Sequence, residues 1–382
     1  MKIRVRAGAG AGLVAVAVLA GCTSATQAPT PSQTSSVSAT AHRVDAVALG
    51  RQVDLYFAND PTDAFRNRQA LVVSVDGQIV LERYWHSTAA TSGNIESAGK
   101  TILSMLIGIA LDEGTLRNLD QTVGELLPDY RSVMSPTVAA ITLRQLLTMT
   151  SGLPPDGDFI TAVFTSKPQD WVRQILQRGQ TGPTGTFQYS SAGSHLLSAI
   201  LSHATRRSTL AYAREKLFDP LGISTRPATE VIAAPENLDD YRRAQFTWPT
   251  DPQGRYIGGG GQKLTARDMA RFGQLWLQNG RWKDRQLVPA AWIQAAHTHA
   301  VPVHEFPADA YGYQVWLGTA NGHRALFARG FAGQLIEIVP DLGLVVAVLS
   351  RHDPDPRSGA ERGTADGEYV SLVSDVIAPL VR

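Results

Sequence analysis

Strand-forming segments lie near both ends of this chain, and a long stretch of helical pattern separates them. Near the N-terminal end, residues 70–75 and 78–84 are rich in β-branched and aromatic types and flank Asp76-Gly77, a typical hairpin turn. Four more such runs follow near the C-terminal end, at residues 313–317, 323–328, 334–339 and 344–349. Strands bury their apolar faces by pairing, so this order predicts one sheet built from both ends of the chain.

The residues between these strands show helical periodicity and no convincing strand. The clearest helical segments there are 142–148, 171–177 and 193–203, and three more outside the middle are 44–57, 265–278 and 368–380. We therefore predict an α/β fold, with a mostly antiparallel sheet flanked by helices and an inserted all-helical lobe at about residues 116–250. Clefts between two such lobes are common ligand sites.

The composition excludes several classes of protein. Of the 382 residues, 43% are hydrophobic and 18% are charged, which excludes a wholly disordered chain. Lys and Arg number 35 against 34 Asp and Glu, and this balance argues against a nucleic-acid partner. The single cysteine, Cys22, excludes an intramolecular disulfide and a cysteine-based metal site.

The N-terminal segment has the pattern of a targeting signal. Three basic residues precede an apolar run at residues 7–19, which is too short to span a bilayer comfortably. The run ends in Leu19-Ala20-Gly21-Cys22, which resembles the lipobox of bacterial lipoproteins; an ordinary secretory signal is the alternative. We expect lipidation of Cys22 and a protein at the outer face of the cytoplasmic membrane. The predicted parts are a signal peptide at 1–21, a Ser/Thr/Pro-rich tether at 22–42 and a folded domain at 43–382.

A serine and a lysine three residues apart open an apolar helix that runs to Leu111. The Gly-x-Ser-x-Gly nucleophile motif is absent, because Ile95 occupies its first glycine position. Residues three apart share a helix face and side chains lean toward the N-terminus, so Lys100 is expected to reach back over Ser97. Free N–H groups at the helix start favour a developing oxyanion. The alternative is that Ser97 only caps the helix while Lys100 is solvated.

A tyrosine precedes the apolar helix that starts near Gly193. Tyr189 lies in Phe187–Ser191, at a junction of loop and helix from which a side chain can reach into a cleft. A phenol beside a lysine can share a proton with it and act first as base and then as acid. The alternative is an ordinary core tyrosine.

Five segments together resemble one family. They are Ser97–Lys100, Leu119–Pro128, Ile141–Leu153, Tyr189–Ser191 and Gly259–Asp268, and they occur in family order. The set is similar to the serine β-lactamase-like family, which includes class C β-lactamases, D-Ala-D-Ala peptidases, family VIII esterases and 6-aminohexanoate-dimer hydrolases. The likeness covers nearly all of residues 65–352.

The resemblance implies the roles of the site residues. Ser97 is then the nucleophile, Lys100 its activating partner and Tyr189 the general base and acid of a two-step reaction through an acyl-enzyme. The family's third motif corresponds to Ala328-Arg329-Gly330, which assigns the oxyanion hole to the N–H groups of Ser97 and Phe331. No metal and no organic cofactor is implied.

Two departures from the family pattern affect substrate binding. Ser191 replaces the usual asparagine of Tyr-x-Asn, and its hydroxyl reaches less far than an amide. Ala328 replaces the Lys or His that binds a substrate carboxylate. Arg329 could compensate, but strand neighbours point to opposite faces. The pattern favours the esterase and aminohexanoate-hydrolase branches of the family. The residues expected to bind the substrate are Ser191, Arg329, Gly330 and Phe331.

Three other groups of residues receive simpler interpretations. His297, His299 and His304 fit no zinc-binding spacing. The glycines at 258–261 lack the Lys-Ser/Thr of a phosphate loop, so they predict close backbone approach near the cleft. Asp156 and Asp158 are expected to solvate a turn; the alternative is that they border the substrate site.

The sequence thus predicts a monomeric serine hydrolase that cleaves a small ester or amide. Two alternatives stay open at this point. One is a penicillin-binding protein that trims or senses cell-wall peptides. The other is a non-catalytic binding lipoprotein on the same scaffold.

Overall fold

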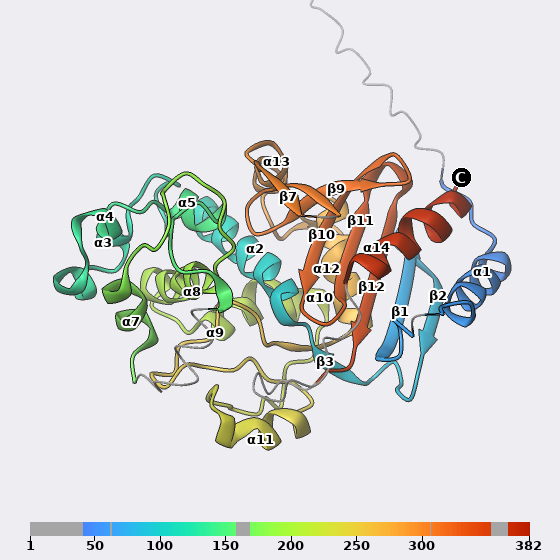
Figure 1. The fold of residues 1–382 in the computed structure, drawn as a ribbon, viewed down its shortest axis with the longest axis horizontal. Coiled ribbons are helices and arrows are strands. Elements are labelled where there is room, and N and C mark those ends of the chain that lie inside the picture. The colour runs from blue at the N-terminus through green and yellow to red at the C-terminus, as the bar shows by residue number, and fades with distance from the viewer. Residues whose placement is uncertain (1–40, 62, 158–168, 306, 353–365) are drawn as a thin grey trace, which may run out of the picture. The chain divides into compact units, whose positions relative to one another are not determined.

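The computed structural model describes residues 41–61, 63–157, 169–305, 307–352 and 366–382 (Figure 1). The predicted signal peptide, Cys22, nearly all of the tether and Asp158 lie outside the described residues. Among the described helices, none combines the length and the apolar character needed to cross a membrane.

An eight-stranded sheet forms the centre of the fold, and every pairing in it is antiparallel. Its order is β2 (Gln78–Tyr84), β1 (Arg68–Val75), β12 (Leu344–Ser350), β11 (Gln334–Val339), β10 (His323–Gly330), β9 (Trp316–Ala320), β8 (Ala308–Tyr311) and β7 (Val301–Glu305). The two ends of the chain meet where β1 pairs with β12, for example at Leu71 and Val348. The predicted mostly antiparallel sheet built from both ends is confirmed.

Some strand boundaries differ from the sequence prediction. The run at 313–317 becomes a strand only from Trp316, because a turn precedes it in which the Gly312 N–H donates to the carbonyl of Val315 and Gln314 has a φ of 59°. Strands β7 and β8 were not predicted. Both are short and carry polar residues or proline, so pairing rather than their own pattern makes them strands: β8 pairs with β9, and β7 pairs with β8. Two small sheets pair β3 (Ser92–Asn94) with β4 (Lys263–Thr265), and β5 (Arg281–Trp282) with β6 (Arg285–Gln286).

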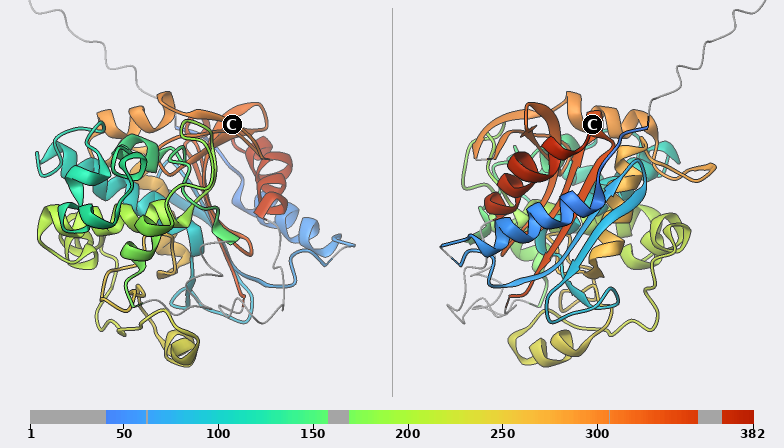
Figure 2. Two further views of the ribbon diagram at one scale, coloured as in Figure 1. Left: turned by 60° about the vertical axis from the view of Figure 1, so that its left-hand side comes forward. Right: turned by 90° about the vertical axis from the view of Figure 1, so that its right-hand side faces the viewer.

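Helices cover both faces of the sheet. One face carries α1 (Ala46–Ala58) and α14 (Asp366–Leu372), which lie together in front of the strands in Figure 2. The other face carries α12 (Ala266–Leu277), and α2 (Gly99–Asp112) lies between this side and the helical lobe. All seven residues of β12 are buried, as expected for a strand that is covered on both faces.

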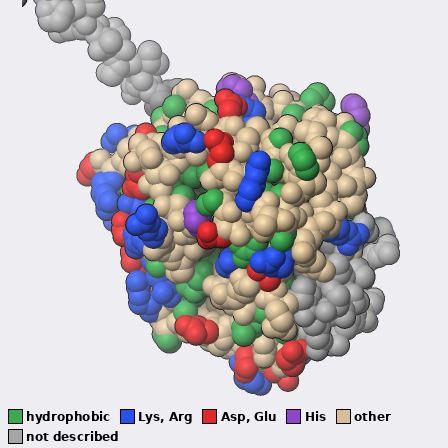
Figure 3. All heavy atoms as spheres, turned by 90° about the vertical axis from the view of Figure 1, so that its left-hand side faces the viewer, with side chains coloured by type: hydrophobic (Ala, Val, Ile, Leu, Met, Phe, Trp, Pro, Cys, Tyr) green, Lys and Arg blue, Asp and Glu red, His purple; other side chains and the backbone are tan. Residues whose placement is uncertain are grey.

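The residues between α2 and β4 form short helices and turns. These helices are α3 (Val123–Leu126), α4 (Pro136–Ala139), α5 (Leu143–Leu147), α7 (Trp171–Arg178), α8 (Ser191–Thr205), α9 (Thr209–Ala213), α10 (Asp219–Leu221) and α11 (Leu238–Arg243), and α13 (Ala290–Thr298) follows later. The first eleven residues of α8 are buried, so this helix forms the centre of the lobe. Acidic and basic side chains are interspersed over the face that Figure 3 shows, with ion pairs such as Arg117–Glu125 and Arg144–Asp120 on the lobe.

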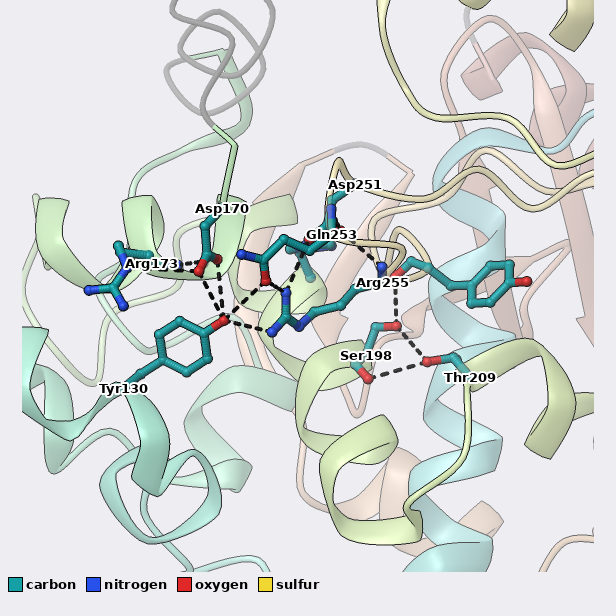
Figure 4. A network of polar contacts seen from close by, with 10 residues as sticks. Tyr130, Asp170, Arg173, Ser198, Thr209, Asp251, Gln253 and Arg255 are labelled. Atoms are coloured by element: carbon teal, nitrogen blue, oxygen red, sulfur yellow. Dashed lines mark hydrogen bonds and ion pairs between the residues drawn. The ribbon is translucent and has the colours of Figure 1, made fainter.

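A polar network joins separate parts of the lobe (Figure 4). The Tyr130 hydroxyl accepts a hydrogen bond from Arg255 at 2.6 Å and donates to Asp170 at 3.0 Å. Asp251, which is fully buried, accepts hydrogen bonds from the backbone N–H groups of Gln253 and Arg255, each at 2.9 Å. Its other oxygen lies 3.2 Å from Nε2 of His195, on α8. This carboxylate therefore ties the 251–255 turn to the central helix of the lobe.

We expect Asp251→Ala to lower the free energy of unfolding by about 3 kcal/mol, because it leaves buried donors without an acceptor. Urea denaturation followed by circular dichroism measures this change. The matched control is Asp284→Ala, at an exposed carboxylate in the β5–β6 turn, with an expected change within about 0.5 kcal/mol. Equal denaturation midpoints for the two variants would contradict the structural role of Asp251.

Candidate active site

Ser97 lies in a single 3-10 turn, Glu96–Ala98, that leads directly into α2. Ser97 itself is partly exposed. Lys100 is 1% exposed, and its Nζ donates hydrogen bonds to Oγ of Ser97 and to the carbonyl of Gly259, each at 2.7 Å. The expected contact between Lys100 and Ser97 is therefore present, and the solvated alternative for Lys100 is wrong.

Tyr189 joins these two residues from the segment that precedes α8. Nζ of Lys100 lies 4.8 Å from the centre of its ring, and both Ser97 and Lys100 lie close enough to lower the pKa of the phenol. The ring also stacks on Trp316, with centroids 5.4 Å apart and an interplanar angle of 17°. The structure thus brings the three predicted catalytic side chains into one cluster.

The phenol of Tyr189 is held in its protonated form. Burial raises its pKa above the ordinary value of 10, while the positive charge of Lys100 and the hydrogen bonds with Ser97 and Lys100 oppose that rise. The net direction is upward. A proton shared among these groups is therefore available to move when Ser97 reacts.

The glycine run at 258–261 packs against the nucleophile turn. A Cβ on Gly260, whose φ is 138°, would lie 2.3 Å from the carbonyl oxygen of Glu96. A Cβ on Gly259 would lie 3.0 Å from Cβ of Ser191. Only residues without a side chain fit here, which confirms the predicted close backbone approach.

The end of β10 lies against the same turn. A Cβ on Gly330 would lie 2.4 Å from the carbonyl oxygen of Ile95 and 3.0 Å from Cβ of Glu96. Phe331 follows with a side chain that is 58% exposed. The backbone at Gly330 thus packs against the residues that directly precede Ser97, which agrees with an oxyanion hole made of the N–H groups of Ser97 and Phe331.

The structure places Ser191 and Asp156 in contact with each other. The Ser191 hydroxyl donates to Oδ2 of Asp156 at 2.9 Å, and the Ser191 N–H donates to the other oxygen. Ser191 is 8% exposed, so its hydroxyl holds the start of α8 to the loop at Asp156. Asp156 therefore differs from the solvated turn residue that the sequence predicted.

The two neighbours in the third motif point to opposite faces of the sheet. Ala328 is 4% exposed and packs in the core against α2, near Ile102. The guanidinium of Arg329 lies 4.9 Å from the ring centre of Trp316, the residue that stacks on Tyr189. Arg329 is therefore on the side of the sheet that carries Tyr189. The ring of Trp316 contacts both side chains.

Sequence reasoning missed the ion pair between Glu96, which directly precedes the nucleophile, and the buried His352. Nε2 of His352 lies 2.8 Å from Oε1 of Glu96, and Asn94 donates to the same oxygen. Burial alone would raise the pKa of Glu96, but the hydrogen bond and charge of His352, together with Lys100, outweigh it and hold that pKa below its usual value. Glu96 also has a φ of 49°, a strained backbone conformation. No sequence signal connects residues that are 256 positions apart.

The histidines near residue 300 do not converge on one point. His297 accepts a hydrogen bond from Trp276 at 2.9 Å, and burial lowers its pKa to about 4. His299 stacks on Tyr313 instead. Within the part of the chain that the structure describes, no group of three or more His, Cys, Asp or Glu side chains is arranged to hold a metal ion.

Comparison with known proteins now identifies the family. The family model described as Beta-lactamase matches residues 62–371. This chain belongs to the beta-lactamase family. Members of this family are serine hydrolases that include amidases, esterases and peptidases.

Individual members of the beta-lactamase family show moderate similarity to this chain. Penicillin-binding protein 4 of Amycolatopsis lactamdurans is 28% identical over 74% of this chain and 80% of its own length. The 6-aminohexanoate-dimer hydrolase of Paenarthrobacter ureafaciens is 25% identical over 78% of this chain and 74% of its own. The solved structure of a penicillin-binding protein homologue from Caulobacter crescentus shares the fold, with a TM-score of 0.64, 18% identity, and coverage of 87% of this chain and 97% of that one.

Proposed function

We propose that this protein hydrolyses a small ester or amide through an acyl-enzyme on Ser97. The observation that carries the proposal is the geometry around Lys100. Its Nζ donates two hydrogen bonds of 2.7 Å, one of them to Oγ of Ser97, and the same nitrogen lies 4.8 Å from the ring centre of Tyr189. A serine hydroxyl is a weak nucleophile unless an adjacent group takes its proton, and this cluster supplies such a group.

The geometry supports a two-step reaction. Oγ of Ser97 attacks the substrate carbonyl while its proton passes to the Lys100–Tyr189 pair. The N–H groups of Ser97 and Phe331 stabilise the negative charge on the carbonyl oxygen. The pair then gives the proton to the leaving group, and a water molecule releases the acyl group by the same route in reverse.

The substrate-binding residues favour substrates other than carboxylate-bearing β-lactams or peptides. Ala328 lies in the core, where it offers no charge, and the Ser191 hydroxyl is bonded to Asp156. The relatives named penicillin-binding protein and 6-aminohexanoate-dimer hydrolase keep the amide class open beside esters. We expect a single protein chain and one small molecule to be sufficient for the reaction, without metal or organic cofactor.

A fluorophosphonate probe tests the proposal directly. Intact-mass spectrometry of the full-length protein after labelling should show one adduct, which peptide mapping places on Ser97. Absence of an adduct on folded protein would instead support the non-catalytic binding lipoprotein. A stable adduct with penicillin, formed without turnover of ester substrates, would support the penicillin-binding alternative.

We also propose that the protein is anchored by lipid on Cys22 at the outer face of the cytoplasmic membrane. The support is the sequence Leu19–Cys22 after a short apolar run. In a bacterial host that expresses the full chain, we expect the protein to partition into the detergent phase and Cys22→Ser to abolish that partition. Equal partition of the two proteins would contradict the anchor.

A further inference from the structure

A small cavity opens beside the nucleophile turn. Its volume is about 120 Å³, and it lies between Asn94–Glu96 and the segment at 231–241 that includes the start of α11. Val231, Ile232 and Pro249 give it apolar walls, and Tyr241 and Glu96 also line it. The catalytic cluster proposed above does not use this space.

The carboxylate of Glu96 is the charged group of this cavity. Among the described residues, both side-chain hydrogen-bond partners of this carboxylate, His352 and Asn94, meet Oε1, so Oε2 has none. The side chain remains 27% exposed. Its charge also reaches Tyr241, where it adds to the effect of burial in raising the pKa of the phenol. The carboxylate is therefore directed partly toward the cavity.

Glu96 is also held firmly in this position. Its N–H donates to Oδ1 of Asn94 at 2.9 Å. Its partner His352 has a side chain that is only 4% exposed. Glu96 immediately precedes Ser97 in the chain. A group bound at the Glu96 carboxylate is therefore close to the nucleophile. The cavity is thus placed to bind part of a molecule that reacts at Ser97.

The chemistry of the cavity selects one kind of group. A partly buried carboxylate with a free oxygen favours a positively charged hydrogen-bond donor, since an ion taken from water needs a paired charge. The volume corresponds to about four water molecules, which is sufficient for an ammonium and a few carbon atoms. The apolar walls suit those carbons.

We propose that this cavity is a specificity pocket that binds an ammonium group on the acyl part of the substrate, with Glu96 Oε2 as its acceptor. The inference rests on the proposed acyl-enzyme function at Ser97. It narrows the substrate class to esters or amides of small amino acids that carry a free amine.

Matched esters test the pocket. Glycine ethyl ester and β-alanine ethyl ester are compared with ethyl propionate and ethyl butyrate, in which a methyl group replaces the ammonium. Rates are measured by titration at about pH 6.5, where the amines are mostly protonated. We expect the ratio of kcat/KM, amine over methyl, to fall at least tenfold in Glu96→Gln. In Asp284→Asn, which changes an exposed carboxylate elsewhere, the ratio should equal that of the wild type.

A binding measurement keeps the test independent of catalysis and of the Glu96 variant. Calorimetry with Ser97→Ala protein should show β-alanine ethyl ester binding at least tenfold more tightly than ethyl butyrate. N-acetylation of the amine should remove that preference.

Two results would overturn the pocket while leaving the hydrolase intact. One is an unchanged ratio in Glu96→Gln, and the other is equal binding of the amine and methyl esters, in each case with a fluorophosphonate adduct on Ser97. Absence of that adduct, with no hydrolysis of any ester, would instead overturn the proposed function and the pocket with it.

Discussion

Ser97→Ala is expected to lower kcat/KM for ester hydrolysis by about 10⁴-fold or more, because the acyl-enzyme cannot form without Oγ. Lys100 and Tyr189 remain in the variant, but they then have no nucleophile to activate. The residual rate reflects only binding and the backbone N–H groups near 330–331. Initial rates with p-nitrophenyl butyrate measure the loss.

The expected loss is chemical rather than structural. The substitution removes one hydrogen bond from Lys100 and leaves the other, to the carbonyl of Gly259, so we expect only a small change in the unfolding temperature. Ser132→Ala is the matched control, since Ser132 is exposed in the 3-10 helix Pro128–Val133. Its activity should equal that of the wild type. Retention of more than a tenth of the activity in Ser97→Ala would assign the reaction to another residue.

The sequence was sufficient to predict what depends on local spacing. Lys100 contacts Ser97 because two residues three apart at a helix start face the same way, whatever the rest of the chain does. The central strands could be predicted because their apolar runs are covered on both faces. Tyr189 was identified through its motif and its place before α8, and the structure places it beside Lys100.

Contacts between distant parts of the chain could not be predicted. The pair Glu96–His352 exists because β12 ends beside the nucleophile turn, and a histidine two residues beyond a strand carries no signal of that. Strand β7 depends on pairing at the sheet edge rather than on its own residues. The alternation of side chains along a strand did not show which face of the sheet carries Arg329. The contact of Arg329 with Trp316 in the structure shows it.

Tyr189→Phe is expected to have the second largest effect on kcat/KM, because Tyr189 transfers protons in the proposed reaction. The substitution removes only the phenol oxygen and keeps the ring that stacks on Trp316, so the cluster should stay in place. Loss of a group that transfers protons in the transition state costs about 10²–10⁴-fold in kcat/KM. The matched control is Tyr84→Phe on β2, another phenol with a raised pKa, about 12, but bonded to Glu82 outside the site.

The pH dependence of kcat/KM distinguishes a role of Tyr189 in proton transfer from a role in packing alone. Burial raises the pKa of Tyr189 above 10, so at neutral pH the phenol is protonated and only a small fraction of the enzyme holds it as a base. That fraction grows tenfold with each pH unit below the pKa, so kcat/KM of the wild type and of Tyr84→Phe should rise steeply between about pH 7 and 9. Tyr189→Phe should lose this rise and retain a low, nearly flat profile. A rise of the same slope in Tyr189→Phe would exclude the phenol as the base and leave Lys100 to take the proton of Ser97.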